Sequence, residues 1–258
     1  MKITGNTILI TGGGSGIGLA LAEEFSKLGN KVIVAARSAR KLELAAEKGL
    51  QQLPVNMSAR ESIESLARTV VTRFPALNVV IHNAGIMKNE NLRTTNTSDI
   101  AVETIATNLA GPILLTTALL PHLLKQADAT IMTVTSGLGF VPLAMTPTYS
   151  ATKAAIHSYT QSLRYQLQGS SVRVIELVPP YVQTELMGSR QLHDPAAMPL
   201  DQFIAEVMGI LKSQPSVTEV LVKRVHPLRF AASEGPEKYE AVWREMNERV
   251  STARAREF

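Results

Sequence analysis

The stretch that decides the fold is TILITGGGSGIG, residues 7–18, in which a short apolar run ends in a cluster of glycines. A helix-period pattern of apolar residues follows over 17–28, so the glycines join a strand to a helix. Such glycines allow a tight turn and let the backbone approach a pyrophosphate, while the helix N-terminus presents N–H groups and partial positive charge. The stretch therefore predicts a strand, an anion-binding turn and a helix. Taken alone, a glycine-rich turn is also compatible with a plain tight connection.

The same alternation of strand and helix patterns continues to about residue 225. β-branched runs at 31–35, 52–55, 78–82, 130–135, 172–178 and 218–222 predict further strands, and the capping-box spacing of Ser58 and Glu61 predicts the start of one intervening helix. Strands that are apolar throughout and separated by helices are typical of a parallel sheet covered on both faces. With no internal repeat or Gly/Ser linker, residues 1–258 are predicted to form a single α/β domain: a Rossmann-type, doubly wound parallel sheet of about seven strands.

Composition excludes several classes of chemistry. The chain has 258 residues, 45% of them apolar, and no cysteine. This length can bury a full core in one large domain. The absence of cysteine excludes disulfides, thiolate metal sites and a cysteine nucleophile, and the sequence predicts no metal site.

The charge pattern and the hydrophobic stretches bear on partners and location. The 26 basic and 22 acidic residues leave a net charge of +4, but the two signs alternate over 223–258 and no aromatic residues alternate with basic ones, so no nucleic-acid partner is expected. The N-terminus turns polar by residue 6, which argues against a secretory signal. The most apolar stretch, 109–124, is shorter than the ~20 residues that span a bilayer and is predicted to be a buried helix. We therefore expect no membrane association and a cytoplasmic protein.

The end of the second predicted strand carries a cation where a carboxylate is common in dinucleotide folds. The run there is Ala35-Ala36-Arg37-Ser38. A carboxylate at this place binds the adenosine 2′-hydroxyl, whereas a guanidinium accommodates a 2′-phosphate. Arg37 therefore favours NADP(H) over NAD(H), although it could also be a surface residue that precedes a helix.

Tyr149 and Lys153 are four residues apart in a predicted helix, so they share one helix face. A free tyrosine has a pKa of ~10, and a nearby ammonium favours the phenolate. The pair predicts that Lys153 lowers the pKa of Tyr149, which would then act as a general acid or base. Ser136, which follows a strand, is a candidate for polarising a substrate oxygen.

These residues together resemble a known family. The markers are the T-G-x-x-x-G-x-G turn at 11–18, Asn83-Ala84-Gly85, Asn108, Ser136 and Tyr149-x-x-x-Lys153. In this order and spacing they resemble the short-chain dehydrogenase/reductase (SDR) family, in its branch of ~250 residues. The start of the chain and the Pro179-Pro180 turn resemble the DltE-like group of oxidoreductases.

The resemblance implies hydride transfer between an NADP(H) nicotinamide and a ketone, an aldehyde or a secondary alcohol. It implies a catalytic set in which Tyr149 is the acid/base, Ser136 holds the substrate oxygen, Lys153 also binds the nicotinamide ribose and Asn108 orders a water. It further implies a cofactor-binding set: Gly12, Ser15, Gly16, Ile17, Gly18, Arg37, Asn56, Asn83, Ala84, Gly85, Tyr149, Lys153, Pro179, Val182 and Thr184. In that set the Asn56 amide oxygen would accept from adenine, and the Val182 backbone and the Thr184 hydroxyl would contact the carboxamide. Pro180 stands where the family has glycine, so the shape of this loop is expected to differ.

The C-terminal third shapes expectations about substrate and partners. By the resemblance, residues 185–200 are a substrate lid; they are loop-like and poor in charge, which favours a small neutral or apolar carbonyl or alcohol. Residues 234–258 are predicted to be a helix and tail whose apolar stripe either docks on the chain's own sheet, covers the active site or contacts another subunit. The resemblance implies a homodimer or homotetramer built from the helices that carry Asn108 and Tyr149. A non-enzymatic NADP(H)-binding regulator is the alternative function, and the intact catalytic set argues against it.

Overall fold

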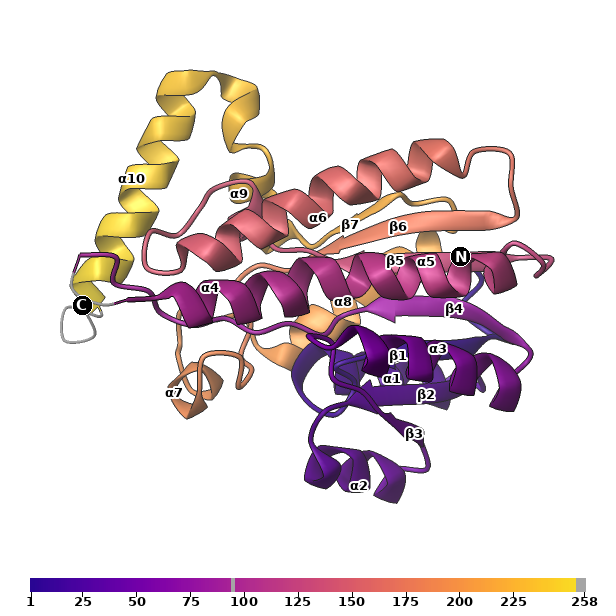
Figure 1. Ribbon diagram of the computed structural model, residues 1–258. Helices are drawn as coiled ribbons and strands as arrows, with labels where there is room; N and C mark the ends of the chain where they lie inside the picture. The colour runs from indigo at the N-terminus through magenta and orange to yellow at the C-terminus, as the bar shows by residue number, and fades with distance from the viewer. Residues whose placement is uncertain (94–95, 254–258) are drawn as a thin grey trace.

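A seven-stranded parallel sheet forms the centre of the protein in the computed structural model, which describes residues 1–93 and 96–253 (Figure 1). The strand order is β3-β2-β1-β4-β5-β6-β7. The strands are β1 (Thr7–Thr11), β2 (Lys31–Ala36), β3 (Gln51–Pro54), β4 (Leu77–His82), β5 (Ala129–Val134), β6 (Val172–Val178) and β7 (Glu219–Leu221). Each predicted strand is confirmed to within one residue at either end. The order reverses between β1 and β4, and such a switch point is where doubly wound sheets bind ligands.

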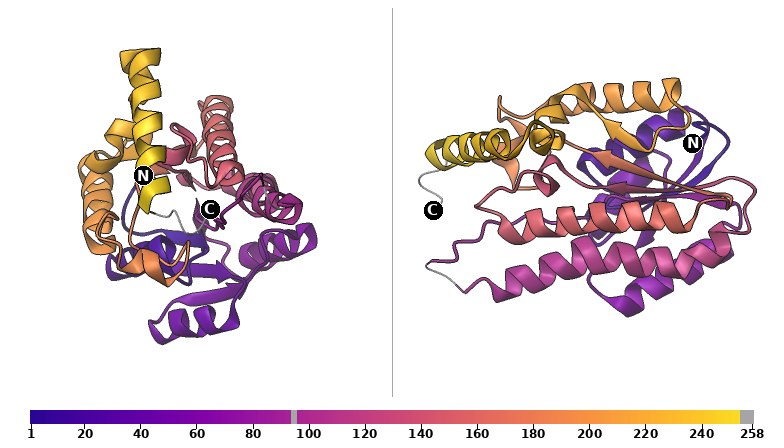
Figure 2. Two further views of the ribbon diagram at one scale, coloured as in Figure 1. Left: turned by 90° about the vertical axis from the view of Figure 1, so that its left-hand side faces the viewer. Right: turned by 90° about the horizontal axis from the view of Figure 1, so that it is seen from above.

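Helices cover both faces of the sheet (Figure 2). The α-helices of the described residues are α1 (Gly16–Lys27), α2 (Ala39–Glu47), α3 (Arg60–Arg73), α4 (Ser98–Ile105), α5 (Gly111–Leu123), α6 (Pro147–Gln166), α7 (Ser189–Leu192), α8 (Leu200–Ser213), α9 (His226–Arg229) and α10 (Pro236–Ala253). Side chains of α1, α2 and α8 join one apolar core and those of α3, α5 and α6 join the other. Within β1, Ile8 and Ile10 enter the first core and Leu9 the second, which explains why the strand is apolar throughout.

The start of α3 differs from the capping-box prediction. The helix begins at Arg60 after Ala59, which provides no side-chain cap. The Ser58 hydroxyl instead donates to Asn56 Oδ1 at 2.8 Å, and the Ser58 N–H donates to the same oxygen at 3.1 Å. Asn56 thus closes an Asx turn that takes Ser58 out of the capping position, because a local side-chain to backbone bond competes with the helix cap.

The long helix that carries Asn108 is continuous from Ser98 to Leu123, through α4, a π-helical turn (Ala106–Ala110) and α5. Its length and its mean hydropathy, 1.3 over an 18-residue window, would allow it to cross a membrane. Length and composition alone are weak evidence for a membrane span, because a core helix can have both. Leu115, Leu119 and Leu123 are fully buried against the sheet and α3. The apolar stretch predicted as a buried helix therefore packs one face into the core, as a core helix does.

The C-terminal helix α10 stands at the end of the molecule where the parallel strands have their carboxyl ends, as does α7 (Figure 1). Residues 254–258 of the predicted C-terminal tail lie outside the described residues. This end of the sheet therefore gathers the loops after β1, β4, β5 and β6, each of which carries predicted site residues.

Candidate active site

The glycine turn after β1 has the geometry of an anion cradle. Gly12 and Gly16 have φ of +67° and +52°, which residues with a Cβ rarely adopt. A Cβ at Gly13 would lie 2.7 Å from Val34 Cγ1, and one at Gly18 would overlap the Asn83 amide. Ser15 precedes α1 without a side-chain cap, so the first N–H groups of the helix face no capping oxygen of that residue. The cradle therefore fits the pyrophosphate of a dinucleotide.

Asn83 and Thr11 lock this turn to the end of β4. Asn83 Nδ2 donates to the carbonyls of Thr11 and Gly12 at 3.0 and 3.1 Å, and Thr11 Oγ1 accepts from the N–H groups of Asn83 and Ala84 at 3.1 and 3.2 Å. The Asn83 side chain thus positions the cradle by binding its backbone. Thr11 is the first residue of the glycine motif, and the sequence predicts no role for its side chain. The structure shows that its hydroxyl joins the two loops.

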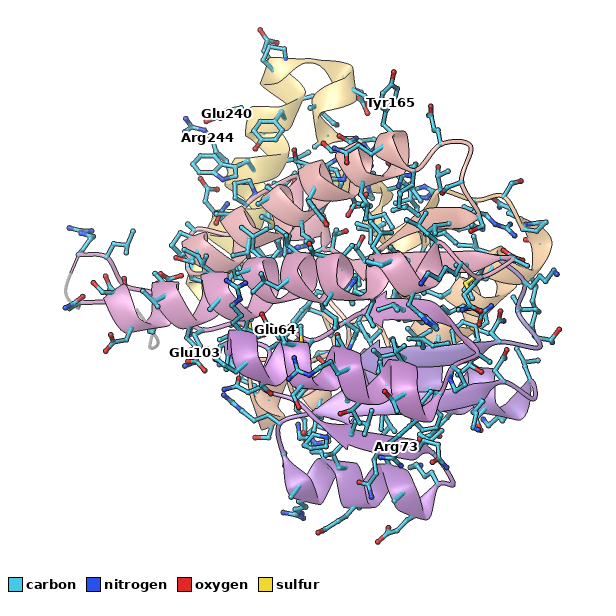
Figure 3. The ribbon with its side chains drawn as sticks, turned by 45° about the vertical axis from the view of Figure 1, so that its right-hand side comes forward. Glu64, Arg73, Glu103, Tyr165, Glu240 and Arg244 are labelled. Atoms are coloured by element: carbon cyan, nitrogen blue, oxygen red, sulfur yellow. The ribbon has the colours of Figure 1, made fainter. Side chains whose placement is uncertain are left out.

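Arg37 lies at the end of β2 as predicted, on the exposed rim of the cradle. Its guanidinium forms an ion pair of 3.4 Å with Glu103 of α4, a carboxylate that Lys88 also binds at 2.5 Å (Figure 3). The hydrogen bond from Lys88 and, to a smaller extent, the one from Arg37 lower the pKa of Glu103. Arg37 is therefore held by an exposed ion pair just after β2.

Lys41 is a residue that the sequence prediction left out of the site. Its Nζ donates to Ser15 Oγ at 2.9 Å and lies 3.7 Å from a carboxylate oxygen of Glu185. A sequence signal exists for it, because Lys41 lies in the first turn of α2, the helix that begins two residues after Arg37. Asn56, in contrast, uses its amide oxygen for the two bonds to Ser58. A contact with adenine would have to come from its NH₂ group, not from the oxygen that was predicted.

Ser136 and Tyr149 meet at the carboxyl end of β5. The Ser136 side chain lies close enough to Tyr149 to act on the pKa of its hydroxyl, and Ser136 Oγ accepts from the Leu138 N–H at 3.1 Å. Burial raises the pKa of Tyr149 to about 12, although the hydrogen bond with Ser136 acts to lower it. The predicted lowering of this pKa is therefore wrong for the protein alone, because loss of hydration outweighs the interaction with Ser136.

Lys153 is the buried cation beside Tyr149. Its Nζ lies 5.5 Å from the centre of the tyrosine ring and donates to the Val134 carbonyl at 2.7 Å. Burial lowers the pKa of Lys153 to about 8. A side chain in this state carries its positive charge at neutral pH and loses it within the range in which enzymes are commonly assayed.

Asn108 lies in the π-helical turn and faces the same centre. Its Nδ2 donates to the Ile86 carbonyl and its Oδ1 accepts from the Ile86 N–H, both at 2.9 Å. A Cβ on Gly85 would lie 3.4 Å from Asn108 Oδ1 and 3.9 Å from Lys153 Nζ, so these three residues converge. Because π-helical turns interrupt the regular backbone bonding, they are frequent at functional sites.

Glu90 fixes the start of the helix that carries Tyr149, and no sequence motif indicated it. Its carboxylate accepts from the Thr148 N–H at 3.0 Å and from the Thr148 hydroxyl at 2.7 Å, and its own N–H donates to the Met145 carbonyl at 2.9 Å. A buried carboxylate in the first turn of α6 satisfies a free N–H and interacts favourably with the helix dipole.

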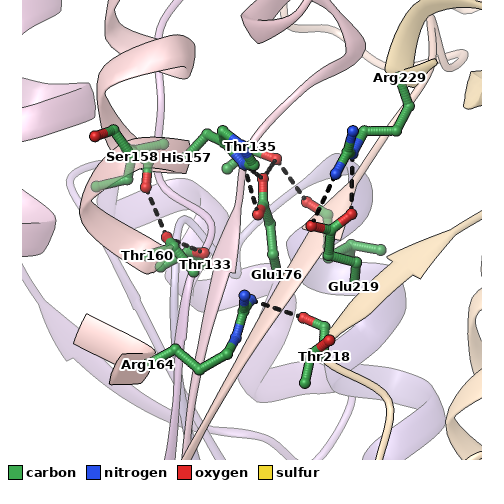
Figure 4. A network of polar contacts seen from close by, with 12 residues as sticks. Thr133, Thr135, His157, Ser158, Thr160, Arg164, Glu176, Thr218, Glu219 and Arg229 are labelled. Carbon is green, nitrogen blue, oxygen red and sulfur yellow. Dashed lines mark hydrogen bonds and ion pairs between the residues drawn. The ribbon is translucent and has the colours of Figure 1, made fainter. Parts of the chain in front are cut away.

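A buried polar network supports the site from behind (Figure 4). Glu176 of β6 has no exposed surface, and its carboxylate accepts from the Thr135 hydroxyl at 2.7 Å and contacts His157 Nδ1 at 2.8 and 2.9 Å. Thr135 directly precedes Ser136, and His157 lies one turn after Lys153 on α6. The network therefore ties the strand end that carries the serine to the helix that carries the tyrosine and lysine.

The loop after β6 reaches the glycine turn. The Pro179 carbonyl accepts from the Gly137 N–H at 2.9 Å, which fixes the loop beside Ser136. A Cβ on Gly16 would lie 3.4 Å from Thr184 Cβ, so Thr184 packs against the cradle, and Val182 pairs with Met198 at the far end of the lid segment, residues 185–200. The predicted carboxamide-binding residues are thus adjacent to the cradle, despite Pro180.

The helix α10 packs on the segment between Ser136 and Tyr149. Asn247 Oδ1 accepts from the Ala144 N–H at 2.6 Å and its Nδ2 donates to the Pro142 carbonyl at 3.1 Å. The apolar stripe of the helix and this segment form a small core. The core includes Leu138, Val141, Leu143 and Met145 of the segment, Met187 of the lid, and Tyr239, Val242, Trp243, Met246 and Val250 of the helix. Of the predicted alternatives, the structure shows intrachain docking, on an active-site loop and not on the sheet itself.

Comparison with known proteins gives the site its context. Residues 6–194 match the family model described as short chain dehydrogenase. The chain belongs to the short-chain dehydrogenase family. It is an oxidoreductase of this family with a Rossmann-like fold, as the sequence predicted.

Relatives and solved structures agree. The chain is 44% identical over 194 residues to the uncharacterized oxidoreductase DltE of Bacillus subtilis, an alignment that covers 72% of this chain and 75% of that protein. It superposes on a 3-ketoacyl-(acyl-carrier-protein) reductase from Brucella melitensis complexed with NADH (TM-score 0.75, 25% identity, 87% and 100% coverage). It also superposes on a short chain dehydrogenase from Burkholderia cenocepacia in complex with NADP (TM-score 0.78, 23% identity, 94% and 99% coverage), which shows the shared fold.

Proposed function

We propose that this short-chain dehydrogenase is an NADP(H)-dependent carbonyl reductase or alcohol dehydrogenase with Tyr149 as its general acid/base. The observation that carries the proposal is the buried cluster of Ser136, Tyr149 and Lys153, in which Lys153 Nζ lies 5.5 Å from the centre of the tyrosine ring, at the same end of the sheet as the glycine cradle. The cofactor supplies the hydride when it is bound. The chain supplies a proton, a polarising hydroxyl and the positions of both.

The residues divide the work by their protonation states. With a pKa of about 12, the Tyr149 hydroxyl is protonated at neutral pH and is therefore ready to give a proton to the developing alkoxide of a reduced carbonyl. Ser136 would donate a hydrogen bond to the same oxygen and so favour the developing charge. The Lys153 ammonium would stabilise the phenolate left on Tyr149, which also allows Tyr149 to act as the base in alcohol oxidation.

Two cations support a preference for NADP(H). Arg37 at the end of β2 and Lys41 against Ser15 flank the rim of the cradle, and a dianionic phosphate binds well between a guanidinium and an ammonium. The exposed pair of Arg37 with Glu103 would exchange for the phosphate at little cost, because such pairs contribute little energy.

The surroundings of Tyr149 support a small neutral or apolar substrate. Leu138, Met145 and Met187 belong to the apolar cluster that α10 completes beside the segment leading to Tyr149. We further propose a cytoplasmic protein that works as a homodimer or homotetramer, without a nucleic-acid or membrane partner.

The test is Tyr149→Phe, assayed with NADPH on a panel of ketones and aldehydes and in the reverse direction on alcohols. Loss of a general acid is expected to lower turnover about 10²- to 10⁴-fold while NADPH binding persists. Substantial reductase activity in this variant would contradict the mechanism. Wild-type protein that binds NADPH but reduces nothing in the panel would favour the regulator alternative.

A further inference from the structure

Gln191 is a buried polar side chain of α7, in the middle of the lid segment, with only 4% of its surface exposed. Its Oε1 accepts from the Met187 N–H at 3.0 Å. Its Nε2 donates to the Val182 carbonyl at 2.7 Å and to Thr184 Oγ1 at 3.0 Å. One side chain of the lid thus binds both residues proposed to hold the nicotinamide carboxamide.

The orientation of this amide follows from its partners. A backbone N–H can only donate and a backbone carbonyl can only accept. Because Met187 presents its N–H and Val182 its carbonyl, the oxygen and the NH₂ of Gln191 cannot be exchanged without breaking both bonds. Thr184 Oγ1 therefore receives a proton from Gln191 and acts as an acceptor in that bond.

This bond determines what the Thr184 hydroxyl can offer to a ligand. Oγ1 also accepts from the Leu186 N–H at 3.4 Å, so both of its lone pairs are engaged. A hydroxyl has two acceptor sites and one donor proton, and only the proton remains. Thr184 packs against Gly16 of the cradle through its Cβ and Cγ2 atoms, so its hydroxyl lies beside the cradle and the proton is the one hydrogen-bonding group that it can offer to a ligand bound there.

We propose that Gln191 is a positioning residue that fastens the lid to the cofactor loop and leaves Thr184 as a hydrogen-bond donor to an acceptor oxygen of the bound dinucleotide. The inference rests on the proposed function only in requiring that the glycine cradle binds NADP(H). Lid closure and cofactor binding then stabilise each other, because the same amide holds Val182, Thr184 and α7 together.

The experiment measures the Kd for NADPH by nicotinamide fluorescence, without substrate, in the full-length protein. Gln191→Glu is the sharpest variant, because it keeps the shape of the side chain but replaces the NH₂ donor with an acceptor that attracts the Thr184 proton to itself. We expect the Kd to rise about tenfold in Gln191→Glu and in Thr184→Val, and to stay near the wild-type value in Thr184→Ser. The double variant Gln191→Glu/Thr184→Val is expected to lose less affinity than the two single variants combined, because part of the effect of each acts through the same hydroxyl.

A second readout follows the lid itself. Trypsin cleaves after Arg190, next to Gln191, and NADPH is expected to slow that cleavage in the wild type but not in Gln191→Glu. The matched control is Gln183→Ala, a glutamine of the loop before the lid whose Nε2 donates to the Asp194 carbonyl at 3.2 Å and not to the Thr184 hydroxyl, and its Kd is expected to stay within about twofold of wild type.

Three results would overturn the inference: wild-type affinity in Gln191→Glu, additive losses in the double variant, or equal effects of Gln191→Glu and Gln183→Ala. Failure of the proposed function looks different. Wild-type protein that binds NADPH without turnover would overturn the catalytic proposal alone, and wild-type protein that binds no dinucleotide would overturn both.

Discussion

At the scale of single residues, burial acts in the same sense on Tyr149 and Lys153. It raises the pKa of the phenol to about 12 and lowers that of the ammonium to about 8, so each group is shifted toward its neutral form. For the tyrosine the neutral form is the one that donates a proton. For the lysine the charged form is the useful one, and the folded protein maintains it against a desolvation penalty.

Lys153→Met is expected to stabilise the protein near pH 7 while it abolishes turnover. The folded pKa of about 8 lies below the ordinary 10.5, so the penalty is fully present below pH 8 and is relieved as pH rises toward 10.5. The shift corresponds to roughly 3 kcal/mol of unfolding free energy in the wild type. Urea unfolding at several pH values is the measurement: wild-type stability should rise between pH 8 and 10.5 relative to that of the variant, and parallel curves would contradict the prediction.

If NADP(H) is the cofactor as proposed, Arg37→Ala and Lys41→Ala are expected to raise the KM for NADPH about 10- to 100-fold each, because each removes a charged hydrogen bond to the 2′-phosphate. The KM for NADH should stay nearly unchanged in Arg37→Ala and should rise less than the KM for NADPH in Lys41→Ala, whose ammonium also binds Ser15 of the cradle. Steady-state kinetics with the two cofactors measure this. Arg40→Ala is the control, an exposed cation of α2 between the two. An unchanged cofactor preference in both test variants would refute the NADP(H) assignment.

At the scale of elements, the pair of His157 and Glu176 joins α6 to the sheet beneath the serine. His157→Leu is expected to cost about 3–5 kcal/mol of unfolding free energy, because it leaves the fully buried Glu176 carboxylate with Thr135 as a donor but without its ring partner. His157→Leu/Glu176→Leu should recover much of the loss, since no unpaired charge remains.

Denaturant unfolding of these variants is the measurement, with Arg244→Ala as the control. Arg244 pairs with Glu240 on the exposed face of α10, and loss of that pair should cost less than about 1 kcal/mol (Figure 3). If His157→Leu cost no more than the control, the buried pair would not be the element that joins α6 to the sheet.

At the scale of the whole molecule, the outer face of α5 and α6 carries an apolar groove. It is lined by Thr116, Thr117, Leu120, Pro121, Leu124, Tyr159, Ser162, Leu163 and Gln166. Leu124 is 45% exposed and Tyr165, at the end of the same face, is 75% exposed (Figure 3). Exposed apolar side chains beside a groove suit an interaction surface, and this groove lies on the helix pair through which we propose that two copies associate.

Light scattering of the wild type is expected to give a mass of two or four chains, and Leu124→Glu is expected to shift it toward one chain of 27.9 kDa, because a carboxylate would be buried in an apolar contact. Leu44→Glu is the matched control, since Leu44 is 44% exposed on α2, away from that face. A wild-type mass of one chain would contradict the proposed assembly.

The sequence by itself determined the alternation of strands and helices, the glycine turn and the identity of Ser136, Tyr149 and Lys153. These features depend on local chemistry: an apolar strand must be buried, and glycine permits the positive φ that Gly12 and Gly16 adopt in the turn. The strands and these site residues can therefore be placed from the sequence to within one residue, whereas helix bounds can differ by more.

The tertiary structure alone decided which residues support that set and in what protonation state they lie. Glu90 and Gln191 bind backbone that they reach only in the fold, and Asn247 contacts Ala144 across 103 positions of sequence. The direction of the Tyr149 pKa shift depends on burial, which no spacing of residues reveals. Desolvation and contacts between distant residues are properties of the packed molecule, and for that reason only the fold could show them.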